Sequence, residues 1–285
     1  MEALVHVVLV PVLLVVVPAG LALITGTGVA RARRAWPWLA VPALVALWLP
    51  RGAVAAALCL PYALLTVALA VGAVHRALHR TQHRATEDVP GPSHGWPVEI
   101  AVWTALAAPA VGGVALVGER AGTRLFGFRL EVLALTVAHF HVAGFTAALV
   151  AGLVARATRP GALSVVAALC VPVGTATVLV GFFAGDDVQL LGALVLTAGM
   201  WATGWSTWRQ LRPASRDRTT RSLLAASSAV LAVTMALALS WAVGEATGLP
   251  HPSIGWMAAT HGVANALGFA PASVLAWRRL RPALL

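Results

Sequence analysis

The sequence predicts an all-α fold: a polytopic transmembrane helix bundle of about nine helices, with the N-terminus outside and the C-terminus in the cytoplasm. Hydrophobic residues make up 59% of the chain and charged residues only 11%, whereas soluble domains carry about 25% charged residues. Most of its apolar segments approach the ~20 residues that cross a bilayer as a helix. In order, the segments are 3–24, 36–49, 53–74, 98–117, 130–154, 161–183, 188–208, 222–244 and 254–276.

The arginines predict how these segments are oriented. The chain has twenty basic residues, all of them arginine, and sixteen lie after the first, third, fifth, seventh and ninth segments. Cytoplasmic loops of membrane proteins are enriched in basic residues. The loops between the segments alternate strictly between many arginines and few. This alternation indicates that all nine segments cross the membrane.

The second segment, 36–49, allows two interpretations. It is short, and Pro50-Arg51-Gly52 separates it from 53–74. These two segments form either two crossings or one re-entrant unit. Tryptophans near the predicted helix ends support the boundaries, because indole prefers the membrane interface. They are Trp36, Trp38, Trp48, Trp96, Trp208, Trp241, Trp256 and Trp277.

Residues 1–285 are predicted to form a single integral membrane domain, because no loop is long enough to fold separately. The formal charge of +10 is spread over the cytoplasmic turns. We therefore expect membrane lipids as partners, with no nucleic acid. Soluble-enzyme motifs that bind nucleotides or activate a serine are absent from the sequence, so an enzyme is not favoured.

Three histidines lie deep within two of the apolar segments. His139 and His141 belong to 130–154, and His261 belongs to 254–276. At 1.5 Å per residue, all three lie roughly 12–16 Å below the outer boundary. Ionisable groups within a membrane are costly and mark candidate functional sites.

Spacing assigns these side chains to helix faces. His139 and His141 are two residues apart and point in different directions, so they cannot chelate one ion together. Thr136 lies on the His139 face and can hydrogen-bond that histidine. Gly144 lies on the His141 face, where a flat cofactor or a second helix could approach. Asn265 and Gly268 lie on the His261 face.

Three interpretations remain open for this polar layer. The first is transport of a small solute, an ion or a proton. The second is a haem or transition-metal redox centre that uses His139, His141 and His261, because neutral imidazole ligates both. The third is interhelical hydrogen bonding alone, which is worth only about 0.6 kcal/mol per pair. Separately, Trp201, Trp205 and Trp208 share a helix face that we expect to contact lipid or a neighbouring helix.

The motifs around these histidines carry a family resemblance. His139-Phe-His-x-Ala-Gly-Phe, followed by Thr260-His-Gly-x-x-Asn-Ala-x-Gly-Phe, resembles the YndJ-like family of bacterial membrane proteins. This resemblance implies a bacterial plasma membrane location and a transporter label, without an established activity. A weaker likeness is to the main subunit of haem-copper oxidases, which would make the three histidines haem ligands. The order of the motifs is reversed here, however, and the copper-site motifs are absent.

Overall fold

The structure is a computed structural model that describes residues 2–84, 95–215 and 217–280. Nine helical units follow one another within these residues, and several are interrupted by short π-helical turns. The α-helices are α1 (Glu2–Pro11), α2 (Val17–Leu21), α3 (Thr27–Ala46), α4 (Ala53–Arg84), α5 (Gly95–Ala121), α6 (Leu130–His139), α7 (Ala147–Ala157), α8 (Ala162–Ala184), α9 (Asp186–Ser206), α10 (Arg212–Ala214), α11 (Arg218–Thr247), α12 (Ile254–Met257) and α13 (Ala270–Leu280). The π-helical turns are η1 (Val12–Val16), η3 (Phe140–Thr146), η4 (Thr207–Leu211), η5 (Ala258–Gly262) and η6 (Ala264–Phe269), and η2 (Leu125–Gly127) is a 3₁₀ turn.

Seven of the nine units are long and apolar enough to cross a membrane. The chain is therefore a multi-pass membrane protein, as the sequence predicts. The other two units are α3, which carries Arg31, Arg33 and Arg34 in its first turns, and the final unit from α12 to α13, which carries His261 and Asn265 in its middle. These polar groups lower the hydropathy of both units. Both nevertheless pack against spanning helices, α3 against α4 and α13 against α11.

The second unit is longer than the sequence predicts. The predicted apolar segment begins at Trp36 because arginines precede it, yet α3 is one continuous helix from Thr27 to Ala46. Its length of about 30 Å at 1.5 Å per residue matches a bilayer core. Its composition, however, does not place it among the seven helices that are apolar enough to cross. Trp36, expected at the interface, is instead buried and donates a hydrogen bond from Nε1 to the Leu13 carbonyl at 2.7 Å.

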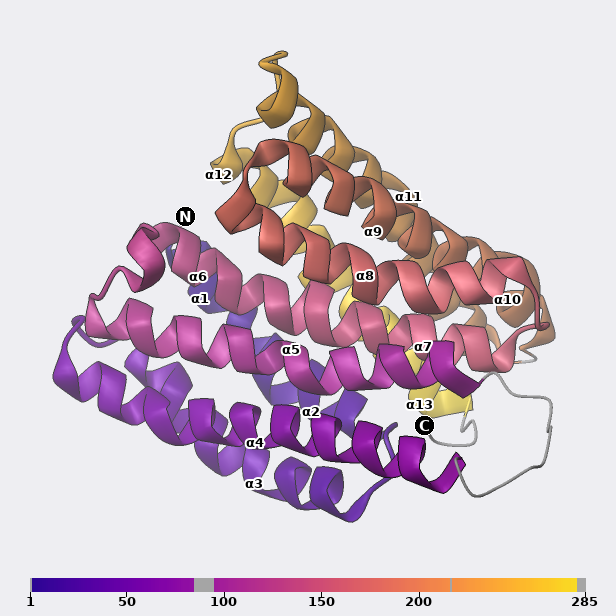
Figure 1. The fold of residues 1–285 in the computed structure, drawn as a ribbon, viewed down its shortest axis with the longest axis horizontal. Coiled ribbons are helices and arrows are strands. Elements are labelled where there is room, and N and C mark those ends of the chain that lie inside the picture. The colour runs from indigo at the N-terminus through magenta and orange to yellow at the C-terminus, as the bar shows by residue number, and fades with distance from the viewer. Residues whose placement is uncertain (1, 85–94, 216, 281–285) are drawn as a thin grey trace.

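The fifth unit, α6–η3–α7, forms the centre of the bundle. In its most apolar stretch 83% of the residues are buried, against 61% or less in each of the other six spans. It packs against α5 along its length, against α1 near its start and against α8 near its end. Figure 1 shows this unit crossing the middle of the molecule, with α3, α4 and α5 on one side and α8, α9 and α11 on the other.

The arginine-rich turns gather at one end of the bundle, which we call the basic end. The ends of α4, α7, α10 and α13 lie there, while the starts of α1, α6 and α12 lie at the opposite, N-terminal end (Figure 1). At the basic end Arg279 pairs with Asp217 at 2.9 Å. The hydroxyl and backbone N–H of Thr220, together with Arg279, hold the pKa of that carboxyl well below its usual range.

The N-terminal end is fastened by four charged side chains. Arg51 bridges the carboxylates of Glu2 (2.8 Å) and Glu119 (2.9 Å), and the buried Arg120 pairs with the same two carboxylates. Arg120 also donates to the Leu47 carbonyl at 3.0 Å, which satisfies a carbonyl at the end of α3. Two positive and two negative charges therefore neutralise one another where α1, α3, α4 and α5 meet.

Candidate functional site

The predicted polar layer divides into two hydrogen-bonded clusters, around His141 and around His261, and one imidazole without a hydrogen-bond partner among the described residues, that of His139. Each cluster is located at a π-helical turn. Such turns insert an extra residue into a helix, change the direction of its side chains and are frequent at functional sites. Here η3 follows His139 and contains His141, while η5 and η6 contain His261 and Asn265. The sequence predicted regular helices at both positions.

His141 is fully buried and makes a hydrogen bond with each ring nitrogen. Its Nδ1 lies 2.7 Å from the Val137 carbonyl, so Nδ1 carries the proton and donates. Its Nε2 lies 2.5 Å from the hydroxyl of Tyr62 on α4 and therefore accepts from that hydroxyl. Gly112 on α5 leaves room for the ring, since a Cβ there would lie 2.7 Å from His141 Cε1.

His261 is held by a second network. Its Nδ1 donates to the Thr234 carbonyl on α11 at 2.7 Å, and its Nε2 accepts from Asn265 Nδ2 at 3.3 Å. The same Asn265 nitrogen donates to the His261 carbonyl at 2.9 Å, and Asn265 Oδ1 accepts from the Thr234 hydroxyl at 3.1 Å. The network joins the last helical unit to α11.

His139 differs from the other two histidines. Its imidazole is only partly buried and has no hydrogen-bond partner among the described residues. It packs edge-on against Phe140, with ring centroids 5.8 Å apart. The structure therefore ties His141 to α4 and His261 to α11, and it leaves His139 outside both hydrogen-bonded networks.

The other predicted residues mainly shape the packing. Thr136 donates to the Val132 carbonyl of its own helix at 2.8 Å and not to His139. A Cβ at Gly144 would lie 2.6 Å from the Cβ of Ala108, so a second helix, α5, occupies the space next to it. At Gly268 a Cβ would lie 3.1 Å from Val230 Cγ2 on α11.

Two partners of the histidines were not predicted from the sequence. Tyr62 is the only tyrosine in the chain and lies in an apolar segment, which was a usable signal. Thr234 was not singled out, because threonine is common in transmembrane helices and usually bonds to its own backbone. It does so here as well, donating to the Val230 carbonyl at 2.9 Å.

These residues do not fit a haem or metal centre in this arrangement. A metal ligand needs a free imidazole nitrogen, and both nitrogens of His141 and of His261 are already engaged in hydrogen bonds. Within residues 2–84, 95–215 and 217–280, no three His, Cys, Asp or Glu side chains are grouped so that they could hold a metal ion.

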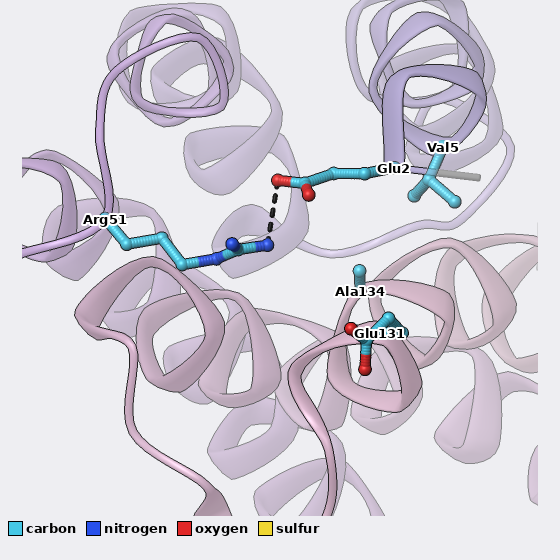
Figure 2. A pocket seen from close by; sticks show the side chains of 5 residues that line it. All are labelled: Glu2, Val5, Arg51, Glu131 and Ala134. Carbon is cyan, nitrogen blue, oxygen red and sulfur yellow. Dashed lines mark ion pairs between the residues drawn. The ribbon is translucent and has the colours of Figure 1, made fainter.

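A small pocket lies at the N-terminal end, above the layer. Val5 and Glu2 of α1, Arg51, and Glu131 and Ala134 of α6 line it. Figure 2 shows Arg51 and Glu2 pointing toward each other, with the two α6 residues on the facing side. Nearby, His6 is buried and its Nε2 has no hydrogen-bond partner among the described residues.

Comparison with known proteins settles the family. A model of the YndJ-like protein family matches residues 7–269, nearly the whole chain and both histidine motifs. The chain belongs to the YndJ-like family. No curated protein and no solved structure matches this YndJ-like protein.

Proposed function

We propose that this YndJ-like protein is a transporter that moves a proton or another small polar solute across the bacterial plasma membrane. His139, His261 and Asn265 form its polar layer. The observation that carries the proposal is the His139 imidazole, which is left without a hydrogen-bond partner among the described residues although it lies deep in a transmembrane helix. An unpaired polar group in hydrocarbon is costly unless water or a solute reaches it.

The exposure pattern of α6 supports access from the N-terminal end. Glu131 is exposed, and partly exposed residues continue along one side of α6 as far as His139. From Phe140 to Ala155 every residue except Ala143 is buried. A passage that enters at Glu131 and is closed beyond the level of His139 accounts for this change.

The final helical unit is also open around its histidine. All residues from Ala258 to Ala264 are partly or fully exposed, and the two buried residues that follow, Asn265 and Ala266, precede Leu267, which is 49% exposed. The partial exposure of His261 supports access of water or a solute to its side chain.

Reconstituted vesicles provide the test. Purified protein in liposomes that contain a pH-sensitive dye is challenged with a pH gradient, and parallel vesicles are tested for glycerol and urea uptake by light scattering. We expect uptake in at least one assay, abolished by His139→Gln. The matched control is His75→Gln, which changes an exposed histidine at the basic end and leaves uptake intact. Wild-type vesicles that behave like empty ones in both assays would refute the proposal.

A second candidate is a purely structural role, which the closed networks of His141 and His261 favour. In that case neither assay shows uptake, and replacing His141 or His261 lowers thermal stability without another effect.

The absorption spectrum of the purified protein tests the redox alternative. We expect no Soret band, because the histidine nitrogens of both networks are already engaged.

A further inference from the structure

We propose that the outer face of α9 and η4 holds an anionic phospholipid at the basic end of the bundle. The site consists of two parts, an apolar strip for an acyl chain and a pair of arginines for the phosphate. We call the two together the Trp–Arg stripe, which comprises Trp201, Trp205, Trp208, Arg209 and Arg212. It is separate from the histidine layer and does not depend on the proposed transport function.

The apolar part is a continuous exposed strip along α9. With the exposed Ala198 included, its side chains recur at alternating spacings of three and four residues, which places them on one face of a helix. Leu191 and Leu194 are 55% and 49% exposed, and the strip continues through the three indoles at 44%, 57% and 38%. The residues between them, such as Ala202, Thr203 and Ser206, are buried against the bundle. This face of the helix is therefore left for lipid.

The basic part follows directly on the indoles. The guanidinium carbon of Arg212 lies 3.9 Å from the centroid of the Trp208 ring, and that of Arg209 lies 5.4 Å from the Trp205 ring. Stacking of this kind holds a guanidinium by its face and leaves its N–H groups free at the edge. Those edge donors match the bidentate geometry of a phosphate.

These two arginines differ from Arg76 and Arg279 at the same end, and from the exposed Arg33 and Arg34 by their stacking on indoles. Arg76 is paired with Glu99 and Arg279 with Asp217. By contrast, neither Arg209 nor Arg212 forms an ion pair with any carboxylate that the structure describes. The backbone N–H of Arg159, in the α7–α8 turn, donates to Gln210 Oε1 at 3.1 Å and so fastens that turn beside the two arginines. The uncompensated positive charge predicts an anionic occupant.

The dimensions fit a lipid and not a free anion. From Trp201 to Arg212 the helix rises about 16 Å at 1.5 Å per residue, close to half of a ~30 Å hydrocarbon core. The arginines thus lie at headgroup depth when the indoles lie beside the acyl chain. A soluble phosphate would use the arginines and leave the apolar strip uncovered, whereas a phosphatidylglycerol-like lipid covers both.

Native mass spectrometry of the full chain tests the site, with phosphatidylglycerol and phosphatidylcholine as probes. We expect the wild type to retain phosphatidylglycerol preferentially. The double variant R209Q/R212Q should retain it roughly 25-fold less, because each basic residue near an anionic surface contributes about a fivefold gain in affinity. The matched control R33Q/R34Q removes the same charge from exposed arginines of α3 at the same end. Equal losses in the two double variants would overturn the proposal.

Two further measurements distinguish a lipid site from a soluble-anion site and from a contact between two copies of the chain. Trp208→Leu keeps both charges and removes the stacking, and we expect a clear loss of phosphatidylglycerol. Glycerol 1-phosphate carries the headgroup chemistry without acyl chains and should not compete. Unchanged retention by Trp208→Leu, or displacement by glycerol 1-phosphate, would contradict a lipid site. So would a wild-type dimer that the Trp208 change converts to monomers, since the stripe would then be covered by a second copy.

Discussion

At the residue scale, the histidines of this chain separate into satisfied and unsatisfied groups. His141 and His261 each donate from Nδ1 to a backbone carbonyl and accept at Nε2, which fixes the same neutral tautomer in both. His139 has no such partners among the described residues. Satisfied imidazoles link neighbouring helices, whereas an imidazole without a partner is costly in an apolar environment unless water reaches it.

The Tyr62–His141 bond is expected to stabilise the bundle. Tyr62→Phe removes the donor to Nε2 and leaves a fully buried acceptor without a partner. We expect a loss of about 1 kcal/mol in the free energy of unfolding, between the ~0.6 kcal/mol average for polar contacts within a bilayer and the 1–3 kcal/mol cost of an unsatisfied buried group. Thermal unfolding in detergent measures the loss.

A hydroxyl elsewhere provides the control. Thr177→Val removes a side chain that donates only to the Val173 carbonyl of its own helix, at a partly exposed position. Its midpoint should stay close to that of the wild type. If Tyr62→Phe unfolds at the same temperature as Thr177→Val, the bond has no structural importance.

At the element scale, glycines allow α8 and α9 to pack closely against each other. In α8 they are Gly174 and Gly181, and in α9 they are Gly192 and Gly199, seven residues apart in each helix. A Cβ at Gly192 would lie 2.5 Å from the Val178 backbone nitrogen, and one at Gly199 would lie 2.8 Å from the Val171 nitrogen. Small residues at such interfaces allow backbones in a membrane to approach closely.

Two glycine substitutions with the same chemistry should therefore have opposite effects. Gly192→Ala forces the α8 and α9 backbones apart, and overpacking of this kind costs about 1–3 kcal/mol. Gly72→Ala on α4 meets no atom within 4 Å. Alanine favours the helix over glycine, so this variant should be unchanged or more stable by up to about 1 kcal/mol. Parallel thermal unfolding curves give the comparison, and equal midpoints would show that the α8–α9 contact tolerates separation.

At the scale of the whole molecule, charge is distributed between two ends of different character. The N-terminal end neutralises Arg51 and Arg120 internally through Glu2 and Glu119, whereas the basic end keeps arginines such as Arg209 and Arg212 without carboxylate partners among the described residues. Unpaired positive charge favours the cytoplasmic leaflet, where anionic lipids concentrate. We therefore expect the basic end to face the cytoplasm, which stays a prediction from the arginine pattern of the sequence.

Cysteine labelling checks that orientation. In a background with Cys59 and Cys170 replaced by alanine, Thr123→Cys is placed at the N-terminal end and Arg33→Cys near the start of α3 at the basic end; both positions are exposed. An impermeant maleimide added to intact cells should label Thr123→Cys at once and Arg33→Cys only after permeabilisation. The reverse pattern would invert the topology and place the His139 passage on the cytoplasmic side.

The sequence by itself determined the membrane class, the nine helical units and the family. Each of these follows from local properties. Transfer of an apolar segment into lipid depends on its own composition, and the histidine motifs of the YndJ-like family are contiguous in the chain. The predicted start of α3 was too late. An apolar segment read from the sequence begins only after the arginines, whereas the helix itself begins before them, because their long side chains can reach the headgroups.

Only the tertiary structure decided which histidines are satisfied. Tyr62 lies 79 residues from His141 in sequence, and Thr234 lies 27 residues from His261. Whether each pair meets depends on how the helices pack and on how the π-helical turns rotate the side chains. The same reason applies to Arg209 and Arg212, whose lack of a carboxylate partner among the described residues depends on where every neighbouring acid is placed. Hydrogen-bond satisfaction is a property of the packed bundle, so no single segment carries it.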